Sequence, residues 1–418
     1  MTPSTETKPK PSRGDKTIWL PFESEAHDQP CVQDREACRR HLEQLLADHP
    51  ELFPARMDEG FSFCGRYRSK KQTIQWRRIE VTATGEVYQM RPSFLMPYMM
   101  AKTEEIEKAL YRRQWGVPFD ALAYVFGRDA MFWYRATLQL GRPSLVGTTV
   151  KDPEKLPQDL VADEKHTGRQ GEKVYLATTV APGCFLGASV AQSAGTEDLQ
   201  TAYGEFAAEA RQLQPDDQPN TVCTDGWEAT QAAWRNLFPQ ITVILCFLHA
   251  VLKLKDRCRR CQSWFETWLE KAWHVYAAPT KAAFSQRVRR LRQWAQKQAS
   301  DQVRQAVLAL CLKGPAFATA YDFPQAYRTS NAVDRLMDQQ DRLLYAMRYL
   351  HGATANAIRL VRAYACLWNF HPYGPRTRRG DPGRSSPFGE LNGFQYHDNW
   401  LHNFLIAASL GGRRTAPT

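Results

Sequence analysis

Two aspartates follow short, β-rich runs in the middle of the chain. Asp163 ends the run Leu-Val-Ala-Asp, and Asp225 follows the run Thr-Val-Cys-Thr. Side chains at the carboxyl ends of neighbouring strands can converge on one crevice of an open α/β sheet. Two converging carboxylates bind hard divalent ions through oxygen, and a pair of ions can activate an attacking oxygen and stabilise a leaving one. The two aspartates therefore indicate phosphodiester chemistry with two Mg²⁺ or Mn²⁺ ions.

A third carboxylate has to come from elsewhere in the chain. The segment SNAVDRLMDQQDRLL offers Asp334, Asp338 and Asp341 at positions i, i+4 and i+7 of a predicted helix over 331–350. Acids with this spacing normally face solvent, and Asn331 with Asp334 also fits a helix-capping pattern. Spacing alone therefore leaves open which of the three, if any, reaches the other two aspartates.

The sequence patterns around these acids predict a layered α/β core. Strands are expected in LVAD, EKVYLATTV, CFLGASVA, TVCTDG and ITVILCF, with helices after the third and fourth of them. Three strands followed by alternating helices and strands favour a sheet covered by helices. The segment 249–312 carries only helical patterns, and further helices are expected at 352–368 and near the C-terminus, the last one capped by Asp398.

The N-terminal region has three different patterns. Residues 1–28 are predicted to be a disordered tail, a helix is expected at 34–48, and alternating residues around Gly85 predict a β-hairpin. Residues 118–141 then form a helix, a short turn at Gly127 and a second helix. This is the helix-turn-helix pattern, with Arg128 and Arg135 as candidate DNA contacts, although helix pairs that only pack share it.

The charge balance indicates an anionic partner. Lys and Arg number 55 against 44 acids, a net charge of +11, which suits nucleic acid or an acidic membrane surface. A helix predicted at 281–304 carries Arg287 and Arg290 with few acids, which favours phosphate contacts over a merely solvated face. Ten cysteines are too few for a disulfide scaffold, and we find no membrane span, secretory signal or nucleotide-binding fingerprint. The expected compartment is the cytoplasm.

The three acidic segments resemble the catalytic segments of DDE-type transposases of bacterial insertion sequences, which have an RNase H-like core. The resemblance rests on LVADEKHTGRQGEKVYLATTV, TVCTDGWEATQAAWRNLFPQI and SNAVDRLMDQQDRLL. In that family the first Asp lies on strand one, the second on strand four, and the third acid on a late helix after a Thr/Ser-Asn pair. The resemblance implies Asp163, Asp225 and Asp334 as catalytic, metal-binding residues. Asp in place of the usual Glu at position 334 is a departure.

A second motif extends the resemblance to Mutator-like relatives. Cys246-x-x-His249 resembles their C-x-x-H motif, which a helical insertion follows. His249, Cys246 and His166 are expected to lie near the acids. Cys258-x-x-Cys261 raises the alternative of zinc, but on one helix His249 and Cys258 would be about 13 Å apart, so we expect no zinc site.

The expected architecture is an RNase H-like α/β core with a helical insertion, preceded by a helix-turn-helix region and a small α+β region. In chain order we expect a tail (1–28), an α+β region (29–100), a helix-turn-helix region (101–146), a first core segment (147–249), the insertion (250–327), and a second core segment with C-terminal helices (328–418). The resemblance implies DNA partners, namely terminal inverted repeats and target DNA, a homodimer or larger assembly, and association with the nucleoid. The alternatives are a non-catalytic, transposase-derived DNA-binding protein, a helix-turn-helix regulator, and an RNase H-like nuclease without strand transfer.

Overall fold

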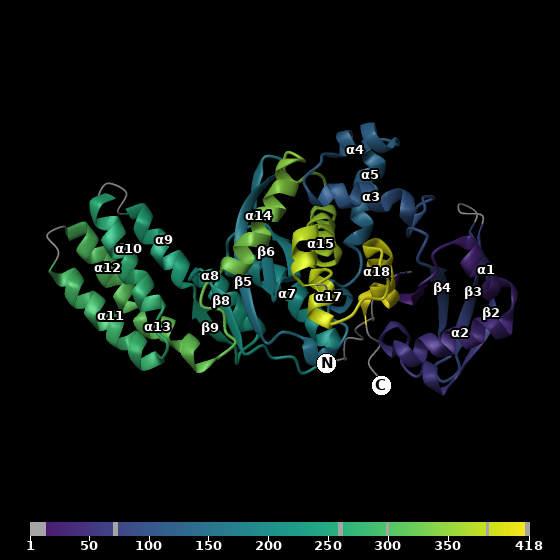
Figure 1. Cartoon of the computed structure of the whole chain (residues 1–418), viewed down its shortest axis with the longest axis horizontal. Helices are drawn as coiled ribbons and strands as arrows, with labels where there is room; N and C mark the ends of the chain where they lie inside the picture. The colour runs from purple at the N-terminus through teal and green to yellow at the C-terminus, as the bar shows by residue number, and fades with distance from the viewer. Residues whose placement is uncertain (1–13, 70–73, 258–261, 298–300, 382–383, 414–418) are drawn as a thin grey trace, which may run out of the picture.

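The protein is a mixed α/β protein with two separate sheets, of four and five strands. The computed structural model describes residues 14–69, 74–257, 262–297, 301–381 and 384–413. The five-stranded sheet lies in the middle of an elongated molecule, between a group of helices at one end and the four-stranded sheet at the other (Figure 1). Within the described residues, no helix is both long and apolar enough to cross a lipid bilayer.

The central sheet has the predicted order of strands and helices. Its strands are β5 (Asp159–Arg169), β6 (Glu172–Ala181), β7 (Cys184–Ala191), β8 (Thr221–Thr224) and β9 (Thr242–Leu245). They lie in the order β7-β6-β5-β8-β9, with β5, β6 and β7 antiparallel and with β8 and β9 parallel to β5. The first strand does not end at Asp163 as predicted. It runs on to Arg169, because β6 pairs with it as far as that residue.

Helices cover both faces of this sheet. Helices α7 (Thr196–Leu213) and α8 (Glu228–Leu237) pack on one face, and α14 (Asn331–Tyr345) and α15 (Thr354–Phe370) pack on the other. Side chains alternate along a strand. Val161 of β5 therefore joins the apolar cluster of α14 and α15, whereas Leu160 and Ala162 join the cluster of α7 and α8.

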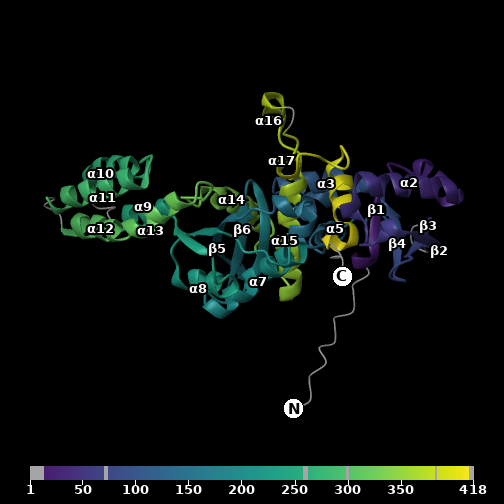
Figure 2. The same cartoon turned by 90° about the horizontal axis from the view of Figure 1, so that it is seen from below.

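In the described residues of the expected insertion, all regular secondary structure is helical. It contains α9 (Phe247–Arg257), α10 (Gln262–Tyr276), α11 (Lys281–Gln296), α12 (Asp301–Leu312) and α13 (Gly314–Ala318). These helices form an apolar cluster of their own, and Figure 2 shows them projecting from the central sheet. The single basic helix predicted at 281–304 is wrong: α11 ends at Gln296, and α12 starts at Asp301.

A group of four helices precedes the central sheet. They are α3 (Thr103–Gln114), α4 (Phe119–Phe126), α5 (Ala130–Leu140) and α6 (Leu145–Thr149). The predicted helix pair is confirmed as α4 and α5. Its turn uses left-handed backbone at Gly127 (φ 71°) and Arg128 (φ 63°), and the Asp129 side chain caps α5. Helix α5 packs on α15 through the buried Trp133 and Leu140.

The N-terminal region is more ordered than predicted. Its elements are β1 (Thr17–Leu20), α1 (Glu25–Gln33), α2 (Arg35–Asp48), β2 (Phe61–Arg68), β3 (Gln75–Val81) and β4 (Val87–Pro92). The hairpin of β3 and β4 is confirmed, with Gly85 (φ 67°) in its turn. The prediction of a tail is wrong for residues 14–28, because β1 pairs in parallel with β4 and buries Ile18 and Leu20. Residues 1–13 lie outside the described residues.

The C-terminal segment connects the N-terminal sheet to the rest of the molecule. It contains α16 (Pro375–Gly380), α17 (Pro387–Asn392) and α18 (Trp400–Ala407). The predicted cap of the last helix is wrong by one residue: the Asn399 side chain, not that of Asp398, accepts from the first turn of α18. Beyond α18, the Ser409 hydroxyl accepts a hydrogen bond of 2.9 Å from the backbone N–H of Trp19 in β1. The sequence predicts that this C-terminal segment belongs to the central α/β core alone. In the structure it also packs on the N-terminal sheet.

Helix α14 is shorter than predicted. It ends at Tyr345, and Arg348 (φ 54°) and Tyr349 (φ 76°) form a left-handed turn after it. The turn places Leu350 where its N–H donates to the carbonyl of Gly168 in β5, at 3.0 Å. Helix α15 spans 354–370, so it starts and ends two residues later than the predicted range.

Substitution of Gly141 by Ala is expected to destabilise the fold by about 1–3 kcal/mol. A Cβ atom there would lie 1.8 Å from the carbonyl oxygen of Arg359, which belongs to the backbone of α15 and cannot rotate away. Gly204 is a matched control inside α7, where a Cβ atom meets only ordinary contacts. Gly204→Ala should therefore stabilise by about 0.5–1 kcal/mol. Urea unfolding of both variants measures the difference, and destabilisation of equal size would contradict the close packing of Gly141 on α15.

Candidate metal centre

Asp163 and Asp225 lie beside each other because of the register of two parallel strands. β5 pairs with β8 so that Leu160 lies next to Val222 and Val161 next to Cys223. The same register continued by two residues brings Asp163 level with Asp225, which directly follows the end of β8. The predicted convergence is thus produced by the first and fourth strands of the sheet, although Asp163 lies within its strand rather than at its end.

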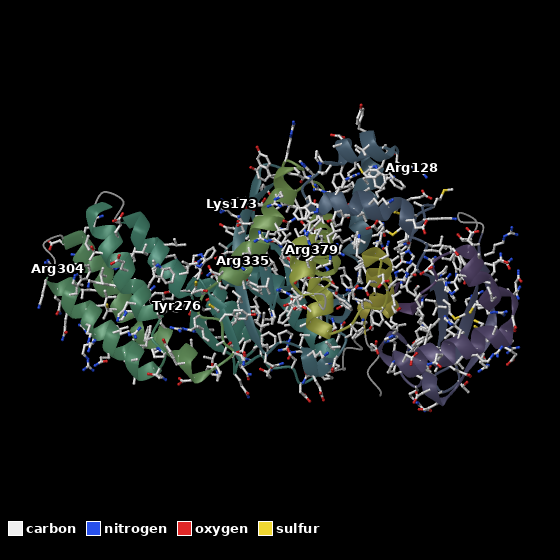
Figure 3. All side chains as sticks on the ribbon, in the orientation of Figure 1. Arg128, Lys173, Tyr276, Arg304, Arg335 and Arg379 are labelled. Atoms are coloured by element: carbon white, nitrogen blue, oxygen red, sulfur yellow. The ribbon has the colours of Figure 1, made fainter. Side chains whose placement is uncertain are left out.

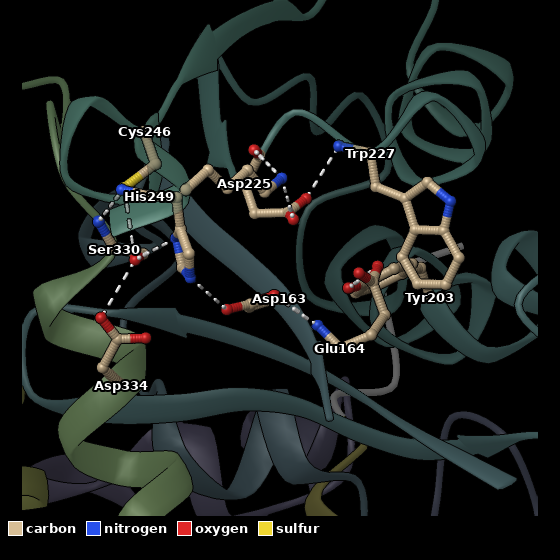
Figure 4. Close-up of polar contacts among 10 residues, drawn as sticks. Asp163, Glu164, Tyr203, Asp225, Trp227, Cys246, His249, Ser330 and Asp334 are labelled. Carbon is tan, nitrogen blue, oxygen red and sulfur yellow. Dashed lines mark hydrogen bonds and ion pairs between the residues drawn. The ribbon is translucent and has the colours of Figure 1, made fainter. Parts of the chain in front are cut away.

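Asp163 is a mostly buried carboxylate, with a side chain that is 13% exposed, and it has several charged neighbours. Its Oδ1 accepts a hydrogen bond of 2.8 Å from the backbone N–H of Glu164, and its Oδ2 lies 4.0 Å from Nε2 of His249 (Figure 4). Burial raises the pKa of Asp163 to about 6, and the nearby carboxylates of Asp225 and Asp334 add to that rise, whereas His249 opposes it. A cation placed among these carboxylates would relieve their mutual repulsion.

Glu164 is a fourth carboxylate at the site, and the sequence analysis missed it. Its Oε1 accepts hydrogen bonds from the hydroxyls of Tyr203 (2.6 Å) and Thr230 (2.7 Å), which belong to α7 and α8. Burial raises the pKa of Glu164 to about 7. The sequence signal was present, since Glu164 follows Asp163 directly. Only the packing of α7 and α8 keeps its carboxylate close to Asp225.

Asp225 lies in a tight turn between β8 and α8. Its Oδ1 accepts a hydrogen bond of 2.8 Å from the backbone N–H of Trp227, and Gly226 between them has a left-handed φ of 91°. Its Oδ2 lies 3.2 Å from Nζ of Lys253 on α9. The turn thus directs the carboxylate toward the acids of β5, and Lys253 partly neutralises it.

Asp334 reaches the site from the first turn of α14. Its Oδ2 accepts a hydrogen bond of 3.1 Å from the hydroxyl of Ser330, whose oxygen also lies 3.0 Å from Nδ1 of His249. The backbone N–H of Ser330 donates to Sγ of Cys246 at 3.1 Å. Burial raises the pKa of Asp334. Among the three candidate acids of this helix, Asp334 is therefore the one that lies with Asp163 and His249.

Cys246 directly precedes α9, and His249 lies in the first turn of that helix, next to Asp163. A hydrogen bond with Cys223 lowers the pKa of the Cys246 thiol to about 4, and a hydrogen bond with Cys246 raises the pKa of His249 to about 9. In the ion-free protein, a protonated His249 next to Asp163 offsets some of the negative charge of the site, and a cation bound at Nε2 would have to displace the proton there. The expected position of both residues near the carboxylates agrees with the geometry.

These side chains form two groups that share Asp163. One group is Asp163, Glu164 and Asp225, and the other is Asp163, His249 and Asp334; within each group the potential ligand atoms lie within 4.8 Å of one another. The first group offers only oxygen, which suits Mg²⁺, and the second adds an imidazole nitrogen, which Mn²⁺ accepts more readily. The donor chemistry therefore fits two divalent ions bridged by one carboxylate.

No known family profile matches this chain. No curated protein matches it either. Its function therefore has to be argued from the geometry of this site and of the surfaces around it.

Three of the predicted neighbours do not join the carboxylates. His166 is exposed, and although it shares a face of β5 with Glu164, it lies two residues, roughly 7 Å, farther along the strand. Asp341 instead forms an ion pair with Lys165, and Asp338 is exposed on α14. Cys258 and Cys261, which raised the zinc alternative, lie outside the described residues.

The four arginines predicted to contact DNA lie on two separate surfaces. Arg128 is in the turn before α5, 3.5 Å from Glu105, and Arg135 is exposed on α5. Arg290 is exposed on α11, whereas Arg287 of the same helix donates to the carbonyl of His274 at 2.6 Å and is partly buried. Figure 3 shows Arg128 and Arg304 on opposite sides of the central sheet, with Arg335 of α14 between them.

Mg²⁺ binding at the Asp163, Glu164 and Asp225 position is expected to strengthen on the order of 10- to 100-fold between pH 5.5 and pH 7.5. The raised pKa values of Asp163 (about 6) and Glu164 (about 7) mean that protons occupy these ligands at the lower pH. In the ion-free protein, the stability that this protonation contributes is present below about pH 4 and is lost as the pH rises to about 7. Mg²⁺ titrations across this pH range test the expectation.

Glu164→Gln supplies the control for the pH experiment. Gln keeps an oxygen that accepts from Tyr203 and Thr230 but carries no titrating proton. The steep region of the pH dependence should then move down toward the pKa of Asp163, near pH 6. An affinity that stays constant from pH 5.5 to pH 7.5 in the unmodified protein would contradict this assignment of ligands.

Proposed function

We propose that this protein is a DDE-type DNA transposase whose central sheet is an RNase H-like catalytic core. The observation that carries the proposal is the meeting of acids from three distant segments, with Asp163 shared between Glu164 and Asp225 on one side and His249 and Asp334 on the other. Acids that merely gather on a surface can come from one segment. Here two neighbouring strands and a helix far along the chain each contribute a carboxylate. The resemblance in the sequence names the same three aspartates.

The topology of the central sheet supports this proposal. Its first and fourth strands, β5 and β8, are neighbours in the order β7-β6-β5-β8-β9. The resemblance places the first two acids on strands one and four, and the third on a late helix, here α14. Between them, α9 to α13 occupy the place of the helical insertion.

The residues of the site have different roles in the proposed phosphodiester cleavage. Two bound Mg²⁺ or Mn²⁺ ions would supply Lewis acidity to the attacking and leaving oxygens. Asp163, Asp225 and Asp334 hold the ions, with Glu164 adding an oxygen beside the first pair. His249 lies with Nδ1 toward Ser330 and with Nε2 toward Asp163. No covalent link to the protein is needed, since water and then a freed 3′-hydroxyl make the attacks.

The surfaces on both sides of the site suit DNA. The helix pair α4 and α5 presents the exposed Arg135, and α11 presents Arg289 and Arg290 to solvent. Basic side chains of this kind neutralise phosphates and give sequence-independent affinity, while a helix in the major groove reads bases. We assign recognition of terminal repeats to α5 and contacts with flanking phosphates to α11. Two ends must be joined, so the working form is a dimer or a larger assembly.

An excision and integration assay tests the proposed function. A donor plasmid carries a marker between the DNA segments that flank the gene on each side, where the proposal expects inverted repeats, and a second plasmid supplies the protein or its Asp225→Ala variant. We expect excised and integrated products only with the unmodified protein. Equal product levels with both proteins would overturn the proposal, and DNA binding without any product would instead favour a non-catalytic DNA-binding protein.

A further inference from the structure

Ser330 lies at the centre of a polar cluster that joins the two ends of the helical insertion. It contacts Cys246 and His249, which precede and begin the insertion, and Asp334, which follows it (Figure 4). A backbone hydrogen bond of 3.1 Å from Phe247 to the carbonyl of Arg328 closes the same junction. The hydroxyl of Ser330 is thus placed between two groups that we assign to the metal centre.

The hydroxyl of Ser330 does not cap α14, the helix that follows it. Ser330 is the N-cap residue of α14, a position where a serine side chain normally accepts from a backbone N–H of the first turn. Here the side chain makes no such bond, and Ser330 is fully buried. Its hydroxyl instead donates to Oδ2 of Asp334 at 3.1 Å. Helix capping therefore does not explain this serine.

The direction of these hydrogen bonds defines the roles of the His249 nitrogens. A hydroxyl has a single proton, and the ionised carboxylate of Asp334 can only accept it. Sγ of Cys246, 3.4 Å from the Ser330 oxygen, either donates its own proton to that oxygen or, as a thiolate, accepts like Asp334, so neither arrangement leaves the Ser330 proton for His249. Toward Nδ1 of His249, at 3.0 Å, the Ser330 oxygen can then only accept. Nδ1 must carry a proton, so Nε2, 4.0 Å from Asp163, is the nitrogen that faces the carboxylates.

We propose that Ser330 is a positioning residue that keeps Nδ1 of His249 protonated and turned away, so that Nε2 is presented to a cation shared with Asp163 and Asp334. This inference rests on the proposed ion-dependent function. Partners of this kind orient a histidine ligand and fix which nitrogen binds the ion. Because the position contains nitrogen, it should take Mn²⁺ in preference to Mg²⁺.

Removing the Ser330 hydroxyl should weaken ion binding at the Asp163, His249 and Asp334 position but not at the Asp163, Glu164 and Asp225 position. In Ser330→Ala, the orientation of His249 is no longer fixed, and we expect Mn²⁺ to bind there about 10- to 100-fold more weakly. The Asp163, Glu164 and Asp225 position makes no contact with Ser330 and should keep its Mg²⁺ affinity within about 2-fold. Ser330→Thr keeps a hydroxyl at the same place and should restore Mn²⁺ binding.

Ser386→Ala is the matched control for the loss of a buried serine hydroxyl. Ser386 is also a buried N-cap residue, and its hydroxyl accepts from the backbone N–H of Gly389 at 3.1 Å, on α17. Its loss should affect stability but not ion binding. Mn²⁺ and Mg²⁺ titrations of the full-length protein without DNA compare all four proteins. Equal loss of Mn²⁺ binding in Ser386→Ala would show a general effect of folding and overturn the inference.

Nitrogen NMR of histidine-labelled protein tests the orientation of His249 independently of activity. With Zn²⁺ as a diamagnetic probe, we expect the His249 signals, assigned with His249→Gln, to show ion-bound Nε2 and protonated Nδ1, and this pattern to be lost in Ser330→Ala. Unchanged His249 signals and Mn²⁺ affinity in Ser330→Ala would overturn the inference. That result would leave the proposed transposase function standing. If the protein instead binds both ions as expected but does not join DNA, the proposed function would be overturned and the role of Ser330 would stand.

Discussion

Replacement of Asp225 by Asn is expected to lower DNA strand cleavage and joining on the order of 10³-fold or more. The loss follows because Asp225 lies with Asp163 and Glu164 as a candidate ion ligand, and an ion at such a site contributes several kcal/mol to the transition state. Asn keeps the oxygen that accepts from the N–H of Trp227, so the turn should survive. Cleavage assays with purified protein and DNA binding assays measure the two properties separately.

Asp216→Asn is the matched control for this change. Asp216 is exposed in the loop before β8, so the same change of charge occurs away from the site. Its cleavage rate should stay within about 2-fold of the unmodified protein, since exposed positions without such contacts tolerate substitution. Cleavage by Asp225→Asn at the rate of Asp216→Asn would show that Asp225 has no catalytic role.

Replacement of Arg362 by Met is expected to destabilise the fold by about 3–5 kcal/mol. Arg362 is a residue of α15. Its guanidinium donates hydrogen bonds to Oε1 of Glu209 at 2.5 Å and to the carbonyl of Pro143 at 2.8 Å. Glu209 also accepts from the backbone N–H groups of Leu145 (2.7 Å) and Val146 (3.0 Å). Loss of the cation leaves a buried carboxylate without its counter-charge, and denaturant unfolding measures the cost.

Arg359→Met separates this effect from the mere loss of an arginine. Arg359 lies one turn earlier on α15, and its side chain is exposed. Its replacement should change the free energy of unfolding by no more than about 0.5 kcal/mol. Similar unfolding midpoints for the two variants would contradict the view that the Arg362 and Glu209 pair holds α15 to α7.

The central sheet and two of the three aspartates were predictable because their signals are local. Apolar β-rich runs mark the strands, and Asp225 is followed by Gly226, which the turn after β8 requires. The third aspartate was ambiguous. Asp334, Asp338 and Asp341 share a helix face in the sequence, and only the packing of α14 against β5 shows that Asp341 pairs with Lys165 while Asp334 approaches Asp163.

The elements that were missed depend on contacts between distant segments. The run Thr17–Leu20 follows a polar stretch and has no local partner, so its sequence predicts a tail. It becomes a strand because β4 pairs with it and the C-terminal segment covers it. Glu164 was missed for the same reason, and Ser330 was noted only as part of the Thr/Ser-Asn pair before the third acid, without its contact to His249. Their neighbours in space, Tyr203 and His249, come from other elements of the chain.

The most direct test of the central claim measures joining of DNA ends by the purified protein. The substrate is a duplex that carries the DNA end next to the gene, where the proposal expects an inverted repeat, and a free 3′-hydroxyl, mixed with target plasmid and Mg²⁺ or Mn²⁺. We predict covalently joined products with the unmodified protein and none with Asp225→Asn or without a divalent ion. Cut DNA without joined products would indicate a nuclease instead, and joining that persists in Asp225→Asn would contradict the proposed site.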